Sequence, residues 1–307
     1  MSATKGRILI GPSSYGDASP EPVKLLQEAG YDVIDNPFKR RITREELLEL
    51  LPGITGLIAG LEPLDRDVLS KCELKALARV GSGMTNVDQD AARDFNIRVS
   101  STPDGPVLAV AELTVGCLMA LLRQTPAMDR AMRGGRWDKR MGRQLCDLNV
   151  AIIGLGRIGQ KTGELLGQLG ANVIASDPFL SGEKNGVPIV ALSDAIKQAD
   201  ALILHASGEE VILDQAAFDE MRDGVYILNP GRGELIAYDA LFKSLDEGRV
   251  AGVWADAHPK EPYDGDLLKY DQALLTPHIG SYSLEGRIKM EMDAAENLLA
   301  DLSAGGV

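Results

Sequence analysis

The sequence predicts an α/β protein built from two tandem parallel-sheet domains. Three observations support this prediction. Short apolar runs alternate with amphipathic helical segments over the first hundred residues, a long apolar helical segment follows, and a second alternating series begins at residue 149. Such alternation is typical of parallel sheets that are covered by helices.

The first series contains five strand-like runs separated by helical patterns. The strand-like runs span residues 7–11, 31–35, 56–60, 74–81 and 98–102, and the helical patterns span residues 20–30, 43–51, 66–72 and 88–96. A helix between two strands returns the chain to the end of the sheet where the first strand began, so successive strands can pair in parallel. We therefore expect a first sheet wrapped by helices.

The second series contains six strand-like runs, at residues 149–154, 171–177, 199–206, 224–231, 249–256 and 273–278. Before it, residues 106–137 predict one long, largely apolar helix that is interrupted near Pro126. Its apolar content exceeds the need of one amphipathic face, so we expect it to pack against both domains or against a second subunit. The tail predicts a last amphipathic helix from Leu284 to about Leu302.

The composition indicates a soluble globular protein without a nucleic-acid or membrane partner. The 307 residues are 45% hydrophobic, enough for two domains with a core each, and the net charge of −13 would repel nucleic acid and an anionic membrane. No apolar run reaches the length of a membrane span, and the N-terminus shows no signal-peptide pattern. Cys72, Cys117 and Cys146 have neither pairing nor metal-ligand spacing. We therefore expect a reducing, cytoplasmic location and no metal site.

A glycine-rich turn opens the second series. The motif "GLGRIG" places Gly154, Gly156 and Gly159 directly after an apolar strand and at the start of a helical pattern. The first glycine allows a tight turn, the second lets the backbone approach a pyrophosphate, and the third allows close packing of the helix on the strand. This position predicts a dinucleotide-binding domain of the Rossmann type.

The strand-like run after this turn ends in Asp177, whose carboxylate can accept hydrogen bonds from an adenosine ribose. A 2′-phosphate there would meet like charge, so the cofactor is expected to be NAD, in preference to NADP. The alternative is that the glycines serve only packing and that Asp177 is a solvated strand end. The predicted cofactor contacts are Gly154, Gly156, Arg157, Ile158, Gly159, Asp177 and Asp256.

Three further polar residues follow strands of the second series. Arg232 is flanked by glycines, Glu261 lies in a proline-bounded loop, and His278 lies in the stretch "TPHIGS". Ligands of open parallel sheets bind beyond the carboxyl ends of the strands, so these residues are expected to line one site. An arginine can bind a substrate carboxylate with two hydrogen bonds, and a histidine can exchange a hydroxyl proton. For each residue alone, a surface salt bridge or a loop polar group is the alternative.

Several ordered motifs resemble the D-2-hydroxyacid dehydrogenase family, which includes phosphoglycerate dehydrogenases and glycerate/hydroxypyruvate reductases. The motifs are "ARVGSGMTNVD", "AVAELTVGCLMALLR", "AIIGLGRIG", "LNPGRGE", "KEP" and "TPHIGS". The resemblance implies that Arg232, Glu261 and His278 form the catalytic set, with His278 as acid and base and Glu261 tuning it. It also implies that the backbone amides of Gly81, Ser82 and Gly83 bind the substrate together with Arg232 and His278.

The resemblance further implies the domain organisation and the partners. Residues 1–101 and 284–307 would form a flavodoxin-like substrate-binding domain completed by the C-terminal helix, and residues 102–283 the Rossmann NAD-binding domain. The substrate would be a small anionic 2-hydroxy or 2-oxo acid, and the protein a homodimer built around the long linking region.

The chain departs from the family pattern at two places. Ser207 stands where members commonly have a proline, and the segment Ala59–Pro63 lacks the arginine and serine of members that act on phosphoglycerate. Lys139 and Arg140 could supply charge for a phosphate instead. Two alternatives therefore stay open: an NAD-binding scaffold resembling the related corepressors, and formate or phosphite oxidation, although formate members are expected to carry glutamine in place of Glu261.

Overall fold

The computed structural model describes residues 4–208 and 210–304 and divides into two compact units. One unit combines residues 1–106 with 281–307, and the other spans residues 107–280. The sequence placed these breaks after residues 101 and 283. Glu209, which belongs to the loop that follows Ser207, lies outside the described residues, as do the first three residues, on which the signal-peptide expectation partly rests.

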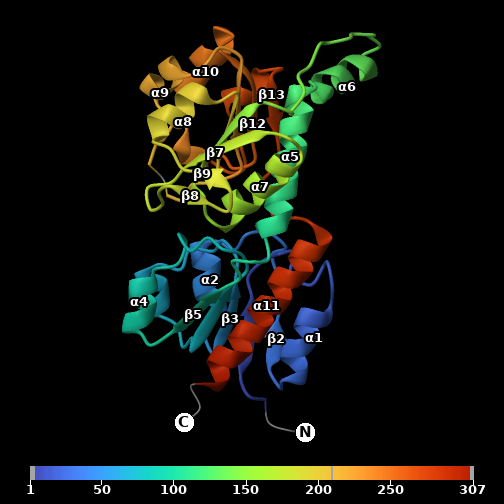
Figure 1. The fold of residues 1–307 in the computed structure, drawn as a ribbon. Helices are drawn as coiled ribbons and strands as arrows, with labels where there is room; N and C mark the ends of the chain where they lie inside the picture. The colour runs from blue at the N-terminus through green and yellow to red at the C-terminus, as the bar shows by residue number, and fades with distance from the viewer. Residues whose placement is uncertain (1–3, 209, 305–307) are drawn as a thin grey trace. The chain divides into compact units, whose positions relative to one another are not determined.

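The first unit is a five-stranded parallel sheet with helices on both faces (Figure 1). Its strands are β1 (Arg7–Ile10), β2 (Asp32–Ile34), β3 (Gly56–Ala59), β4 (Ala76–Arg79) and β5 (Arg98–Ser101). Its helices are α1 (Glu21–Glu28), α2 (Arg44–Leu50), α3 (Arg66–Ser70), α4 (Gln89–Asp94) and α11 (Leu284–Ser303). The strand order β2-β1-β3-β4-β5 is that of flavodoxin-like folds, which confirms the predicted fold of this unit.

Apolar side chains fill both faces of this first sheet. One face packs against α2, α3 and α4, with Leu47 and Val68 in its core. The other face packs against α1 and α11, with Leu26 and Leu298 fully buried. Helix α11 begins at Leu284 because the hydroxyl of Ser283 caps it, accepting the amide of Gly286 at 3.0 Å. The C-terminal helix therefore completes this unit, as expected.

The second unit is a six-stranded parallel sheet in the order β13-β12-β11-β10-β6-β7. The strands are β6 (Asn149–Ile153), β7 (Asn172–Ser176), β10 (Ala201–Leu204), β11 (Val225–Asn229), β12 (Val250–Ala255) and β13 (Ala273–Leu275). The helices are α5 (Val107–Leu122), α6 (Thr125–Arg133), α7 (Arg157–Gln168), α8 (Leu192–Gln198), α9 (Gln215–Glu220) and α10 (Tyr238–Asp246). The strand order reverses between β6 and β10, and open α/β sheets bind ligands at such a point.

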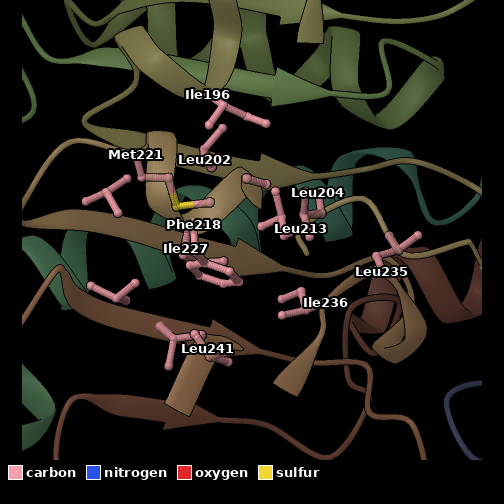
Figure 2. Close-up of a cluster of buried hydrophobic side chains, with 14 of the residues drawn as sticks. Ile196, Leu202, Leu204, Leu213, Phe218, Met221, Ile227, Leu235, Ile236 and Leu241 are labelled. Carbon is pink, nitrogen blue, oxygen red and sulfur yellow. The ribbon is translucent and has the colours of Figure 1, made fainter. Parts of the chain in front are cut away.

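The core of the second unit explains why its strands read as continuous apolar runs. Figure 2 shows part of the cluster in which Phe218, from α9, packs with Leu202, from β10. The opposite face carries a second cluster, to which α5 contributes Leu118 and α7 contributes Leu166. A strand covered on both faces needs apolar residues at every position, and all four residues of β10 are buried.

The long helix expected over residues 106–137 is two helices, α5 and α6, bent by 64°. Gln124 adopts a left-handed conformation with φ of 51°, which ends helical geometry between them. Pro126 lies in the first turn of α6, where its missing amide costs no hydrogen bond, so the proline starts the second helix. Over the described residues, no helix alone combines the length and apolar composition of a membrane span; α5 and α6 meet that test only as this bent pair.

Candidate active site

The glycine-rich turn has the geometry that a dinucleotide requires. Gly154 follows β6 with φ of +94°, and a Cβ there would lie 2.6 Å from the backbone nitrogen of Ala206 after β10, so only glycine fits. A Cβ on Gly159 would collide with the carbonyl of Gly154, because α7 packs directly on the turn. A Cβ on Gly156 would meet nothing within 4 Å, and no side chain caps the twelve-residue helix α7 that starts there. Open space in front of a helix N-terminus that no side chain caps fits a pyrophosphate.

Asp177 follows β7 and is held beside this turn by two backbone amides. Its Oδ2 accepts the amide of Leu155 at 2.9 Å, and its Oδ1 accepts the amide of Phe179 at 2.9 Å. A carboxylate has about four lone-pair positions, so these bonds fix its orientation and leave acceptor capacity for ribose hydroxyls. Arg157 and Ile158, the other predicted cofactor contacts of the turn, form the start of α7.

Glu261 and His278 form a hydrogen-bonded pair. His278 Nδ1 lies 2.9 Å and 3.1 Å from the two carboxylate oxygens of Glu261, and both side chains keep access to solvent. The hydrogen bond to Glu261 raises the pKa of His278 above its usual value, aided by the charge of Asp256 and against the effect of burial and of Arg232. Burial has the largest single effect on Glu261 and acts to raise its pKa, but the hydrogen bonds and charges of His278 and His258 together outweigh it, so the pKa is lowered. The pair favours a charged imidazolium beside a carboxylate.

The backbone of His278 is held in an unusual conformation. Its φ of 54° lies in the left-handed region that residues other than glycine rarely adopt. Its amide donates to the carbonyls of Asp256 and Thr276, each at 3.0 Å. Surrounding bonds of this kind are what keep such a conformation in place, and these conformations are common at active sites.

Asp256 holds the loop that carries His278. Its buried carboxylate accepts the hydroxyl of Thr276 at 2.5 Å and the amides of Ile279 and Gly280 at 2.8 Å and 2.7 Å. The sequence predicted Asp256 as a cofactor contact, which stays a prediction; the observed partners of its carboxylate all belong to residues 276–280. Thr276 was not singled out from the sequence, because its role depends on a strand neighbour twenty residues away.

Arg232 lies in the turn after β11, next to the strand that leads to Glu261. The buried side chain of Asn229 organises this turn, donating to the carbonyl of Arg232 at 2.7 Å and accepting the amide of Gly231 at 3.1 Å. Nη1 of Arg232 donates to the carbonyl of Gly231 at 2.8 Å, which orients the guanidinium. Asn229 was missed from the sequence, although an asparagine before Pro-Gly at a strand end is a recognised turn signal.

Arg232, Glu261 and His278 thus follow three neighbouring strands, β11, β12 and β13, at their carboxyl ends. A cavity of about 340 Å³ in this unit lies elsewhere, since its lining by Ala251, Gly252 and residues 271–274 places it at the amino ends of β12 and β13. The polar side chains that sequence reasoning brought together are therefore at the edge where open parallel sheets bind ligands.

The predicted substrate loop lies in the first unit, after β4. Gly81 has φ of +116° and its amide donates to the hydroxyl of Thr102 at 2.7 Å. Ser82 and Gly83 follow it in the same loop. The Gly81 amide is thus already bonded within its own unit. Of the three amides predicted to bind the substrate, those of Ser82 and Gly83 remain the candidates.

The buried histidine of "LILHAS" has a structural environment. The ring of His205 contacts the hydroxyl of Thr162 at 2.9 Å, and burial lowers its pKa to about 3. It is therefore neutral at physiological pH and is unsuited to acid–base exchange. Among the residues that the structure describes, no group of three or more His, Cys, Asp or Glu side chains is arranged to hold a metal ion.

A glycine-rich turn at the switch point, an acidic residue after the next strand and a paired histidine define an NAD-binding α/β protein with an acid–base group. Residues 115–280 match the model of the D-isomer specific 2-hydroxyacid dehydrogenase NAD-binding domain, and the chain belongs to that family.

Relatives with known names agree with this assignment. A D-3-phosphoglycerate dehydrogenase of Archaeoglobus fulgidus is 30% identical over 92% of this chain and 55% of its own length. A D-lactate/D-glycerate dehydrogenase of Pediococcus acidilactici is 32% identical over 81% of this chain and 83% of its own length. The crystal structure of a glyoxylate reductase from Paecilomyes thermophila has a TM-score of 0.87 and 26% identity, covering 99% of this chain and 97% of that one. The chain spans about half the length of the phosphoglycerate dehydrogenases it matches.

Proposed function

We propose that this protein is an NAD-dependent dehydrogenase that interconverts a small D-2-hydroxy acid and its 2-oxo acid. The observation that carries the proposal is the Glu261–His278 pair, at 2.9 Å, in a domain of a family that binds NAD. An imidazole held by a carboxylate is the arrangement expected for a group that exchanges a proton with a substrate hydroxyl. Arg232, at the end of the neighbouring strand β11, supports binding of an acid.

In this proposal each residue has a distinct task. Bound NAD(H) supplies the hydride acceptor or donor. Nδ1 of His278 bonds to Glu261, so Nε2 is the nitrogen that takes the hydroxyl proton during oxidation and returns it during reduction. Glu261 fixes the ring orientation and stabilises the imidazolium. Arg232 binds the substrate carboxylate through its guanidinium.

The substrate is proposed to belong to the glycerate, hydroxypyruvate and phosphoglycerate group. Relatives named for phosphoglycerate, lactate and glycerate support small acids of this kind. We expect NADH oxidation with hydroxypyruvate, phosphohydroxypyruvate, glyoxylate or pyruvate to exceed that with phenylpyruvate, measured as kcat/KM. If phenylpyruvate were best, this substrate class would be wrong. If no acid were turned over while NADH still bound, the NAD-binding scaffold would be the correct alternative.

The cofactor preference is a separate prediction, which rests on Asp177. Its charge should disfavour a 2′-phosphate by roughly 1–3 kcal/mol, or about fivefold to 150-fold, and within this range we expect NAD(H) to exceed NADP(H) by about tenfold or more in kcat/KM. Asp177→Asn is the matched variant, because the amide oxygen can still accept one of the two backbone bonds while the charge is gone. In that variant the ratio of kcat/KM with NAD(H) to kcat/KM with NADP(H) should decrease. Equal use of NADP(H) by the unaltered protein would refute the ribose assignment.

The remaining assignments stay predictions. Amides of the loop Gly81–Gly83 are proposed to bind the substrate carboxylate, with Ser82 and Gly83 as the donors because Gly81 already bonds to Thr102. A homodimer is supported by the exposed apolar side chains of Trp137 and Met141, 76% and 93% accessible, in the segment that follows α6. Cytoplasmic location is proposed from the charge and cysteine pattern alone.

A further inference from the structure

His258 contacts Glu261 and the loop that carries His278, although the proposed chemistry does not use it. It follows β12 closely and is only 8% exposed. Its ring stacks on that of Tyr263, with ring centroids 4.5 Å apart and planes inclined by 22°. This residue is one of the three histidines of the chain, and sequence reasoning gave it no role.

The backbone of His258 contacts one member of the pair and its ring contacts the loop of the other. The amide of His258 donates to Oε1 of Glu261 at 3.2 Å. Its ring Nε2 lies 3.1 Å from the carbonyl oxygen of Thr276. That same oxygen accepts the amide of His278 at 3.0 Å. One carbonyl therefore joins the ring of His258 to the backbone of His278.

The partner of Nε2 defines the state of the His258 ring. A carbonyl oxygen only accepts, so Nε2 must carry the hydrogen. Nδ1 is buried and has no hydrogen-bond partner among the described residues. A hydrogen on Nδ1 would be a buried donor without an acceptor, which is costly. The contacts thus place a hydrogen on Nε2, where it donates to Thr276.

The segment of His258 also fits closely against the turn of Arg232. A Cβ on Gly233 would collide with the backbone at His258 and Pro259, so these two loops are in direct contact. A displacement of His258 would therefore be transmitted to the loops of Glu261, His278 and Arg232 together.

We propose that His258 is a positioning residue that keeps Glu261 and His278 within hydrogen-bonding distance of each other. Its backbone amide holds Glu261, and its ring Nε2–H holds the loop of His278. The inference rests on the proposed function only in giving His278 a catalytic task. The ionisable groups that face His278 are Glu261, Asp256 and Arg232, and those that face His258 are Glu261 and Tyr263. Loss of the Nε2–H bond should loosen the turn at residues 276–278 and lengthen the contact between His278 and Glu261.

The test is a titration of the histidine side chains by ¹⁵N NMR in the full chain. The protein has three histidines, so their ring signals can be assigned by single substitutions. His258→Phe keeps an aromatic ring against Tyr263 but removes the donor, and His258→Gln restores a donor without the ring. We expect the titration midpoint of the His278 ring to fall by about half a pH unit or more in His258→Phe. In His258→Gln the midpoint should return part of the way to its value in the unaltered protein.

Kinetics and a matched control separate positioning from general loosening. In His258→Phe, kcat/KM should fall roughly tenfold to a hundredfold with little change in NADH binding. Phe218→Leu, in the core cluster of Figure 2, should lower the melting temperature without moving the midpoint of His278. An unchanged His278 midpoint in His258→Phe, or an equal shift in Phe218→Leu, would overturn the proposal.

The titration needs no turnover, so the outcomes for the two proposals can be told apart. A shifted midpoint in a protein that reduces no 2-oxo acid would retain the positioning role and reject the proposed function. Turnover of 2-oxo acids by the unaltered protein, together with an unshifted His278 midpoint in His258→Phe, would support the proposed function and reject the positioning role of His258.

Discussion

Replacement of His278 by alanine should lower kcat/KM for 2-oxo acid reduction by about 10²–10⁴-fold, the range that a positioned general acid contributes. NADH affinity should change little, because the proposed mechanism has the imidazole act on the substrate oxygen and assigns the dinucleotide contacts to Asp177 and the glycine-rich turn. Steady-state kinetics together with a fluorescence titration of NADH would measure both quantities. A His278→Ala protein that kept a tenth of its activity would remove this histidine from the mechanism.

Glu261→Gln is the companion variant, because it removes the charge and keeps the side-chain shape. Reduction needs protonated His278, so kcat/KM is high below the pKa of this group and falls as pH rises through it. The bond to Glu261 raises that pKa, so loss of the carboxylate should move the falling limb to lower pH. Oxidation needs unprotonated His278, so its kcat/KM rises with pH through the same pKa. In Glu261→Gln this rise should also move to lower pH. Identical pH profiles in the two proteins would contradict the assigned role of Glu261.

The parts of the site that depend on local spacing could be predicted from the sequence. The glycine-rich turn needs a tight turn, a close approach and a helix start within six residues, and Gly154 and Gly159 are held by contacts within a few residues or to the adjacent strand. Arg232, Glu261 and His278 could be placed together because each follows a strand, and parallel strands end at a common edge.

The parts that depend on contacts between distant residues could not be predicted in this way. Asp256 and Thr276 meet only because β12 and β13 are neighbours in the sheet, and the sequence does not record that their side chains bond. His258 is a similar case, since its ring partner lies eighteen residues further along the chain. A polar residue near a predicted site can therefore hold the loops in place through partners that the sequence does not reveal.

One missed element did carry a sequence signal. The short hairpin of β8 (Glu183–Lys184) and β9 (Val187–Pro188) turns at Asn185 and Gly186, whose φ values of 52° and 78° are both positive. Asn-Gly is the preferred pair for such a two-residue turn. The hairpin escaped notice because each strand has only two residues, too few to show an alternating apolar pattern.

The second large effect is expected at Arg232, the residue proposed to bind the substrate carboxylate. Arg232→Lys keeps the positive charge but loses the planar fork that can bind both oxygens of a carboxylate. Asn229 fixes the turn, and the hydrogen bond from Nη1 to the carbonyl of Gly231 orients the guanidinium. The flexible ammonium of a lysine would not be held in that orientation. We therefore expect transition-state stabilisation to decrease by about 2–4 kcal/mol, which would lower kcat/KM roughly 30-fold to 1000-fold.

Arg249→Lys is the matched control for this loss. Arg249 belongs to the same unit, where it pairs at the surface with Asp223 and donates to the carbonyl of Met221, and the proposed reaction does not use it. Its substitution should leave kcat/KM unchanged. A simple charge contact at Arg232 would survive replacement by lysine, so an Arg232→Lys protein with the kinetics of its parent would show that a directed two-oxygen contact is not how this protein binds its substrate.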